Sequence, residues 1–218
     1  MKSILFNTEM AKAILDDKKT QTRRVINVTL YGDEKLSIIN DDNKQYLKVE
    51  YENGAYRLEK IQFQIGDILW VREPVKLLKH TVDCDGEYFG TWIKYLADGK
   101  EILFDNFKED VSGKKWFDKC QGVPNGCLRE MARIFLKVTS VRVERLQDIT
   151  EDDICKEGLD NDYLTWWVSE CGTARALRFP IDGWKRLWKS TAKDGYKWED
   201  NPHVFVYEFE RVEKGSAI

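Results

Sequence analysis

Histidine, proline and methionine are scarce in this 218-residue sequence, and its cysteines lack the spacing of a metal site. There are two histidines, His80 and His203, and five cysteines with no C-x-x-C pair. A structural zinc site needs cysteines and histidines at short, paired spacings. The sequence therefore gives no support to a bound metal, and the odd number of cysteines favours reduced thiols.

The sequence also lacks long apolar runs and the glycine motifs of nucleotide-binding enzymes. No stretch approaches the roughly 20 apolar residues that cross a bilayer, and the N-terminus lacks the regions of a signal peptide. We therefore expect a cytoplasmic protein without a membrane partner. No G-x-x-x-x-G-K or G-x-G-x-x-G run is present, which argues against ATP and NAD chemistry. No cofactor is expected.

The composition is that of a globular protein. The chain is 42% hydrophobic and 33% charged, with eight Trp, nine Tyr and ten Phe, and most of these aromatic side chains should lie in the core or on sheet faces. A chain of this size can bury one substantial core. We interpret residues 1–218 as a single domain with insertions at about 28–62 and 80–127.

Apolar periodicity predicts the α+β class with a mainly β chain. Residues 1–6 read as a strand, followed by a helix that Asn7 or Thr8 caps and that ends at Asp16. The alternating runs between Arg23 and Gln64 predict a β-meander with a turn at Asn53-Gly54. Further strands are predicted over 64–73, 133–146 and 204–212, a hairpin over 88–104, a long loop over 105–126, and helices over 150–158, 163–171 and 181–189.

Residues 18–24, Lys-Lys-Thr-Gln-Thr-Arg-Arg, form the most informative stretch of the sequence. They bring an amine, hydroxyls and two guanidinium groups together. From residue 12 to residue 24 the local charge is +3, although the whole chain carries a formal net charge of -3. The contrast indicates a basic patch that can bind an anion or take part in chemistry.

Three further blocks follow this stretch in order: residues 66–73, residues 132–158 and residues 179–202. Together the four blocks resemble the ASCH domain family of the PUA-like superfamily, whose first motif is roughly G-x-K-x-x-E-x-R. Lys19 and Arg24 match that motif, while Asp17 replaces its glycine and Thr22 replaces its glutamate. A threonine at this point is similar to the branch that resembles a small bacterial amidohydrolase acting on acylated cytidine. The last block resembles phage and prophage members.

The resemblance implies a small PUA-like β-barrel with covering helices and β-hairpin insertions. It also implies that Lys19 is the activating base, Thr22 the nucleophile or water-orienting hydroxyl, and Glu157 the third, orienting or proton-transferring group. A lysine acts as a base only when it is neutral, which burial and nearby cations favour and a carboxylate opposes. From the residues alone, a lysine and a threonine three positions apart on a loop are usually solvated surface groups, and this interpretation of Lys19 and Thr22 is favoured over catalysis.

Arginines and aromatic residues supply candidate ligand contacts. Arg23 and Arg24 can grip phosphate or carboxylate oxygens, because a guanidinium fork matches their geometry. Trp70 can stack a base, but its apolar run also suits core packing. A rim ion pair is the simpler interpretation of Arg72 and Glu73. The full set of candidate contacts is Arg23, Arg24, Trp70, Arg72, Glu73 and Arg133.

The sequence thus favours a protein that binds a nucleotide, a nucleoside or RNA in a basic cavity beside residues 19–24. A sharper hypothesis adds hydrolysis of an amide on a modified nucleobase by Lys19, Thr22 and Glu157, without a metal. Ribonuclease action is less well supported, because no residue spacing indicates it. Two alternatives stay open: a non-enzymatic RNA-binding module, and an interaction or assembly protein of a phage particle.

Overall fold

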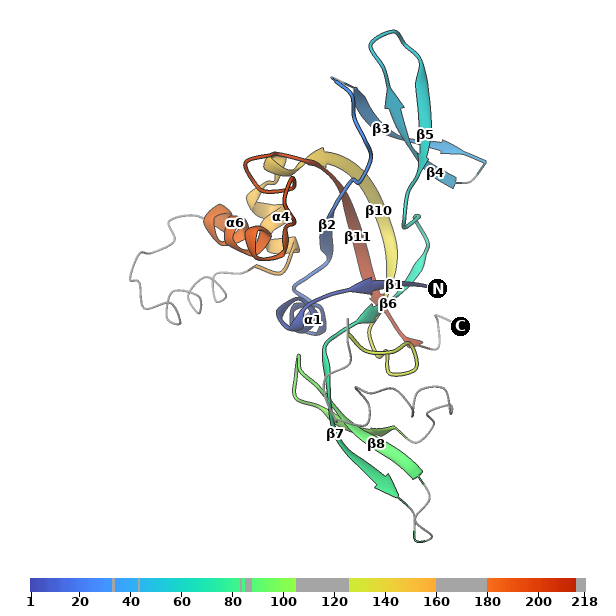
Figure 1. Ribbon diagram of the computed structural model, residues 1–218, viewed down its shortest axis with the longest axis vertical. Helices are drawn as coiled ribbons and strands as arrows, with labels where there is room; N and C mark the ends of the chain where they lie inside the picture. The colour runs from blue at the N-terminus through green and yellow to red at the C-terminus, as the bar shows by residue number, and fades with distance from the viewer. Residues whose placement is uncertain are drawn as a thin grey trace. The chain divides into compact units, whose positions relative to one another are not determined.

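The computed structural model describes residues 1–32, 34–42, 44–82, 84, 88–104, 126–159 and 180–214. The chain divides into two compact units, each built from segments that are distant in sequence. Unit 1 comprises Met1–Asp16, Ile68–Leu136 and Arg211–Ile218, and unit 2 comprises Asp17–Asp67 and Lys137–Glu210. Figure 1 labels most of the helices and strands of both units. Among the described helices, none is long and apolar enough to cross a membrane.

Within the residues that the structure describes, unit 1 contains a parallel strand pair, one helix and a three-stranded antiparallel sheet. Strand β1 (Lys2–Leu5) pairs in parallel with β6 (Ile68–Arg72). Helix α1 (Thr8–Leu15) follows β1, and the side chain of Asn7 caps it by accepting a hydrogen bond from the backbone N–H of Met10 at 2.8 Å. The sheet has the order β7 (Val75–Val82), β8 (Tyr88–Tyr95) and β9 (Glu101–Phe104).

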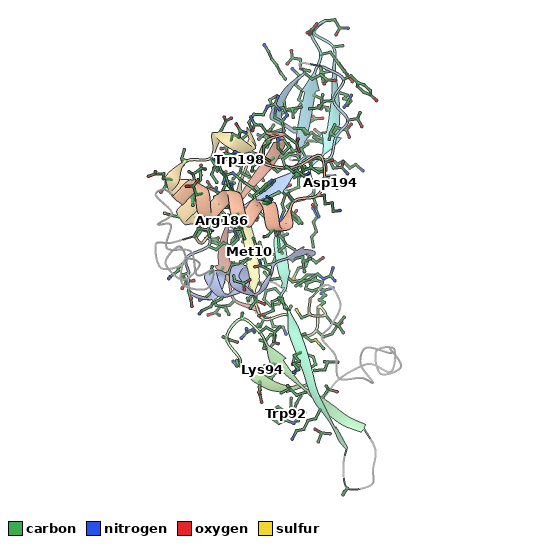
Figure 2. The ribbon with its side chains drawn as sticks, turned by 60° about the vertical axis from the view of Figure 1, so that its left-hand side comes forward. Met10, Trp92, Lys94, Arg186, Asp194 and Trp198 are labelled. Atoms are coloured by element: carbon green, nitrogen blue, oxygen red, sulfur yellow. The ribbon has the colours of Figure 1, made fainter. Side chains whose placement is uncertain are left out.

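The core of unit 1 forms between this sheet and the segment after residue 126. Its fully buried members are Val75, Leu77, Ile93, Tyr95, Cys127, Met131, Ala132 and Phe135. Alternate residues of β8 point away from this core, and Figure 2 labels two of them, Trp92 and Lys94. The hydroxyl of Tyr95 donates to the backbone oxygen of Met131 at 2.6 Å, so the core contains a satisfied polar group.

The described part of unit 2 contains two sheets and two α-helices. Three strands are neighbours in the order β10 (Phe135–Arg145), β11 (His203–Val212) and β2 (Gln21–Val25). Strand β10 begins in unit 1, and β11 ends there. Strands β3 (Lys35–Asp41), β4 (Lys44–Glu50) and β5 (Tyr56–Lys60) form an antiparallel meander. A short 3-10 helix (Leu146–Asp148) leads to α4 (Glu151–Lys156), and α6 (Pro180–Thr191) precedes β11.

The two helices of unit 2 pack on one face of its longer strands. Trp184 and Trp188 of α6, and Ile154 of α4, join Val204 and Val206 of β11 in a buried apolar cluster. This placement follows from the sequence, because the tryptophans recur at the spacing of one helix face. The ammonium of Lys185 in α6 lies 5.1 Å from the ring centroid of Trp198, which follows the helix, and Figure 2 shows Arg186, Asp194 and Trp198 in this region.

Most of the elements predicted from the sequence are confirmed, as is the mainly β, α+β class. The meander over 23–64, the hairpin over 88–104 and the strands of β1, β6, β10 and β11 are present. The described sheets are open, and none of them closes into a barrel. The predicted loop over 105–126, apart from Gly126, and the predicted helix over 163–171 lie outside the described residues.

The start of α4 is better capped than its sequence suggested. An aspartate three positions after Thr150 is a near miss of the usual capping box, which has Glu or Gln there. In the structure Asp153 completes the box: its carboxylate accepts from the backbone N–H of Thr150 at 3.1 Å, and its own N–H donates to the Thr150 hydroxyl at 3.2 Å. Gly158 then ends the helix with φ of 90°.

A buried ion-pair network as the candidate site

The centre of the candidate site is a buried ion pair between Lys19 and Glu157. The ammonium nitrogen of Lys19 lies 2.7 Å from Oε2 of Glu157 and 2.9 Å from its backbone oxygen. The two side chains are 0% and 1% exposed. The backbones also meet in an isolated antiparallel bridge, and the N–H of Thr20 donates to the carbonyl of Lys156. The end of α4 is thereby fixed to the segment that leads into β2.

Arg23 joins this pair to two further carboxylates. Its Nη1 donates to Oε1 of Glu157 at 3.3 Å, and its Nη2 lies 3.0 Å from Oε2 of Glu144 and 3.1 Å from Oδ2 of Asp153. The Arg23 side chain is 0% exposed. A buried guanidinium needs such partners, because an unpaired charge in a low dielectric is costly. The guanidinium therefore ties β2 to β10 and α4.

Arg142 of β10 closes the network on its outer side. It donates to Glu208 at 2.6 Å, to Asp153 at 2.9 Å and, through Nε, to Glu144. The side-chain amide of Gln21 also donates to Asp153, at 3.1 Å. Arg142 and Glu208 are each about a third exposed, whereas the Lys19 pair is sealed. The network thus runs from solvent to a buried centre.

The surroundings of Lys19 favour its neutral form more than water would. Burial lowers the pKa of Lys19, and the charges of Arg24 and Arg23 act in the same direction, while Glu157 opposes them by holding the ammonium. The balance lowers the pKa below its ordinary value. At Asp153, burial acts to raise the pKa, but hydrogen bonds from Thr150 and Gln21 and the charge of Arg23 bring it to about 2.

Thr22 and Arg24 lie on the other face of β2. Side chains alternate along a strand, so Gln21 and Arg23 share one face and Thr22 and Arg24 the opposite one. In the register with β11, Thr22 stands opposite Tyr207. Arg24 follows Thr22 by two positions on the same face of β2. Thr22 is 3% exposed, and the face it occupies is opposite to the one from which Arg23 binds Glu157. Burial lowers the pKa of Arg24, while Glu157 and Tyr207 act to raise it.

The other predicted contacts belong to unit 1. Trp70 is half-buried and packs against the apolar cluster of that unit. Arg72 is half-buried at the end of β6, where its carbonyl accepts from the N–H of Phe6 at 3.4 Å. Arg133 binds Glu73 through two hydrogen bonds of 2.8 and 2.9 Å. Glu73 is fully buried, so this pair is not the exposed rim pair that the sequence suggested.

Arg133 forms a second cluster in unit 1 with groups that the sequence reasoning missed. It also binds Asp98 at 2.7 Å, and its guanidinium carbon lies 3.8 Å from the ring centroid of Tyr95. With a carboxylate on two sides and an aromatic ring beneath, the Arg133 guanidinium is held in place by its neighbours. These contacts favour a structural role for the pair of Arg133 and Glu73.

In unit 2 the sequence reasoning missed Gln21, Arg142, Glu144, Asp153 and Glu208. Four of these residues occupy alternate strand positions, a pattern that in the sequence indicates a solvent-exposed polar face: Gln21, Arg142, Glu144 and Glu208. The one available signal was Asp153, whose spacing from Thr150 already assigned it a local role. Among the described residues, no group of three His, Cys, Asp or Glu side chains is placed to hold a metal ion.

Comparisons of the chain with protein families, with curated proteins and with solved structures gave no match.

Proposed function

We propose that unit 2 is an ASCH-like, PUA-like module that binds a nucleoside or nucleotide and hydrolyses an amide on its base, as in acylated cytidine. The observation that carries this proposal is the contact of 2.7 Å between the Lys19 ammonium and the Glu157 carboxylate. These two residues are 138 positions apart, and the resemblance to the amidohydrolase branch assigns both to one reaction.

The proposed reaction consumes one water molecule and releases cytidine and a carboxylic acid. Neutral Lys19 removes a proton from water that the Thr22 hydroxyl orients, and the water oxygen attacks the acyl carbon. If the Thr22 oxygen attacks instead, an acyl-threonine ester forms when the amine leaves, and water then hydrolyses that ester to the carboxylic acid. The carbon–nitrogen bond then breaks, and the exocyclic nitrogen of cytosine takes up a proton from the lysine. Glu157 orients Lys19 and relays the proton from the lysine to this exocyclic nitrogen.

Two buried donors beside the ion pair support binding of a ligand that carries acceptor oxygens. Within the described residues, Nε of Arg23 and the indole nitrogen of Trp184 are buried and have no hydrogen-bond partner. The guanidinium carbon of Arg23 lies 6.0 Å from the ring centroid of Trp184, so the two donors belong to one region. A buried donor left unsatisfied costs about 1 to 3 kcal/mol, which an acceptor on a ligand would recover.

Incubation of the protein with N4-acetylcytidine, followed by chromatography of the released cytidine, tests this function. We expect turnover by the wild type, a loss of at least about 100-fold in Thr22→Ala, and partial recovery in Thr22→Ser. Thr20→Ala is the matched control, because Thr20 is exposed and contributes backbone contacts. Absence of cytidine release by the folded wild type would refute the hydrolysis, and equal loss in both alanine variants would refute the role of Thr22.

A further inference from the structure

The meander of β3, β4 and β5 has one buried and one exposed face. Leu47 and Val49 of β4 are 0% exposed and mark the buried face. Because side chains alternate, the residues between them belong to the opposite face, and the strand register aligns them with partners on β3 and β5. We call this opposite face the open face; its residues are Lys35, Ser37, Ile39, Asp41, Lys44, Tyr46, Lys48, Glu50, Tyr56, Leu58 and Lys60.

The open face carries an excess of positive charge in a chain that is acidic as a whole. Four lysines stand there against two carboxylates, whereas the formal net charge of the chain is -3. Lys48 is already paired with Glu50 at 2.8 Å. Among the described residues Lys44 and Lys60 form no salt bridge, so their ammonium groups remain available to an anionic partner.

Aromatic and apolar side chains lie among these lysines. Tyr56 is 58% exposed and Leu58 is 38% exposed, and Tyr46, directly opposite Lys60, is half-buried. The ammonium of Lys48 lies 4.9 Å from the ring centroid of Tyr56, which supports that ring from one side. A sheet face that combines exposed tyrosines with lysines is suited to bases that stack and phosphates that bind cations.

We propose that the open face binds single-stranded RNA. Tyr46 and Tyr56 stack bases, and Lys35, Lys44 and Lys60 contact phosphates. Seven strand residues at about 3.4 Å each give a platform of roughly 24 Å, enough for three or four nucleotides. The hydroxyl of Ser37, in the middle of the face, can bind a ribose 2′-hydroxyl, which DNA lacks. This site uses none of the residues of the proposed hydrolytic centre, so either proposal can fail alone.

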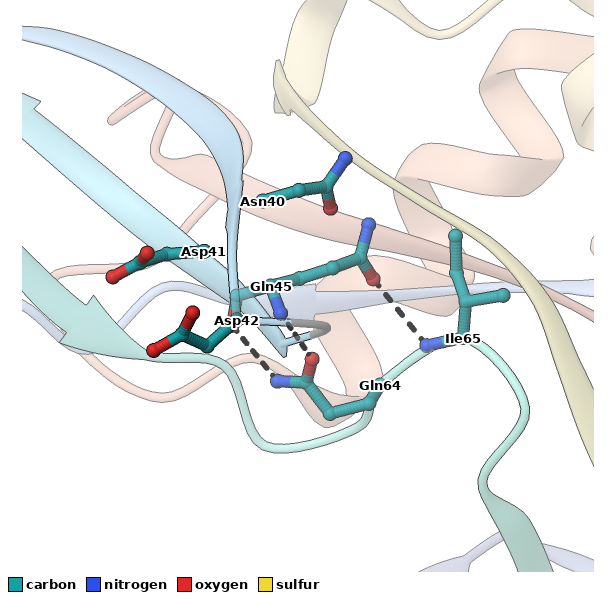
Figure 3. Close-up of a pocket in the computed structure, with 6 residues that line it drawn as sticks. All are labelled: Asn40, Asp41, Asp42, Gln45, Gln64 and Ile65. Carbon is teal, nitrogen blue, oxygen red and sulfur yellow. Dashed lines mark hydrogen bonds between the residues drawn. The ribbon is translucent and has the colours of Figure 1, made fainter.

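A cavity lies past the end of the open face, at the turn between β3 and β4, where Asp41 of that face meets Asn40 and Gln45 of the opposite face, and it provides a place for the edge of a base. It has a volume of about 470 Å³ and is lined by Asn40, Asp41, Asp42, Gln45, Gln64 and Ile65. Gln64 is fixed by two hydrogen bonds to the backbone of Gln45, of 2.6 and 2.9 Å, and Figure 3 shows the amides of Asn40 and Gln45 pointing in the same direction. The carboxylates add acceptors, so we expect the cavity to prefer cytosine, whose amino group donates, over uracil.

Fluorescence anisotropy with labelled 12-mers of C and U RNA, measured over a series of salt concentrations, tests the proposal. Three phosphate contacts predict a slope of log affinity against log salt of about -2. Lys44→Glu/Lys60→Glu should reduce the magnitude of this slope by about 1.4 or more. The matched control is Lys189→Glu/Lys193→Glu, which changes the net charge equally at exposed positions outside the meander and should leave the slope unchanged. Equal effects of the two pairs would refute the site.

The stacking contact has its own matched pair of variants. Tyr56→Ala should weaken RNA binding roughly 5- to 150-fold, whereas Tyr31→Ala, at a residue 80% exposed and outside the strands, should not. Asn40→Ala should narrow the difference in affinity between the C and U oligomers. Equal affinity for single-stranded DNA, or unchanged binding by Tyr56→Ala, would contradict the proposal. Thr22→Ala should bind RNA as the wild type does.

Discussion

The buried pair of Lys19 and Glu157 makes a strong prediction about stability. Lys19→Met keeps the length of the side chain and removes its charge, which leaves a carboxylate that is 1% exposed without its contact at 2.7 Å and with Arg23 at 3.3 Å. Breaking a buried ion pair on one side costs about 3 to 5 kcal/mol, because the other charge stays desolvated. For a chain of this size each kcal/mol lowers the melting temperature by about 2 to 4 °C, so we expect a fall of about 6 to 20 °C.

The double variant separates the pair from its surroundings. Glu157→Gln alone removes the negative charge that faces the Lys19 ammonium at 2.7 Å and should cost a similar amount. In Lys19→Met/Glu157→Gln neither charge remains, so the loss should be smaller than the sum of the single losses by about 2 kcal/mol or more. Arg23 still has Glu144 and Asp153 at 3.0 and 3.1 Å in this variant, so it is not left unpaired.

Thermal and urea unfolding, followed by tryptophan fluorescence and far-ultraviolet circular dichroism, measure these differences. The matched control is Lys18→Met, at the exposed neighbouring lysine, which should change the melting temperature by less than about 2 °C. A similarly small effect of Lys19→Met would refute the reasoning. Strict additivity of the two single variants would also refute it, because it would mean that the two charges do not interact.

Three further predictions concern other parts of the chain. Arg133→Met should cost about 3 to 5 kcal/mol by leaving the buried Glu73 unpaired, and adding Glu73→Gln should recover part of this in urea unfolding. The pKa of Asp153 is about 2 in the folded state and about 3.9 in the unfolded state, so the stability that its carboxylate contributes is complete above about pH 4 and is lost as the pH falls toward 2. Asp153→Asn lacks this carboxylate, so it should lose less stability than the wild type between pH 6 and pH 3. Gly126→Ala should lower the melting temperature more than Gly54→Ala, since both glycines have φ near 80° but only at Gly126 would the new methyl group meet the Arg72 carbonyl oxygen, at 2.7 Å.

Local chemistry allowed much of the secondary structure to be predicted. Asn7 and Thr150 cap the helices that follow them, because each side chain reaches a backbone N–H three positions away. The Asn53-Gly54 pair turns β4 into β5 with Gly54 at φ of 82°. These signals depend on residues that are close in sequence, so no knowledge of the tertiary structure was needed.

The arrangement of the site could not be predicted in the same way. Two partners of Arg23, Glu144 and Glu157, are 121 and 134 positions away, and Glu73 is 60 positions from Arg133, so these contacts depend on how distant segments meet. Arg142 reads from its sequence as a solvated strand residue, and only the packed structure shows its carboxylate partners. Barrel closure likewise depends on distant strands, and the described sheets remain open.

The pH dependence of N4-acetylcytidine hydrolysis by the wild-type protein is the measurement that tests the central claim most directly. If neutral Lys19 is the base, the rate is lost as the pH falls below the pKa of this lysine and rises to a plateau above it. Burial lowers that pKa, so the plateau should begin below pH 10.4, the ordinary value for lysine. A rate that is independent of pH across this range, or no cytidine release at any pH, would contradict the assignment of Lys19 and Glu157 as the reactive centre.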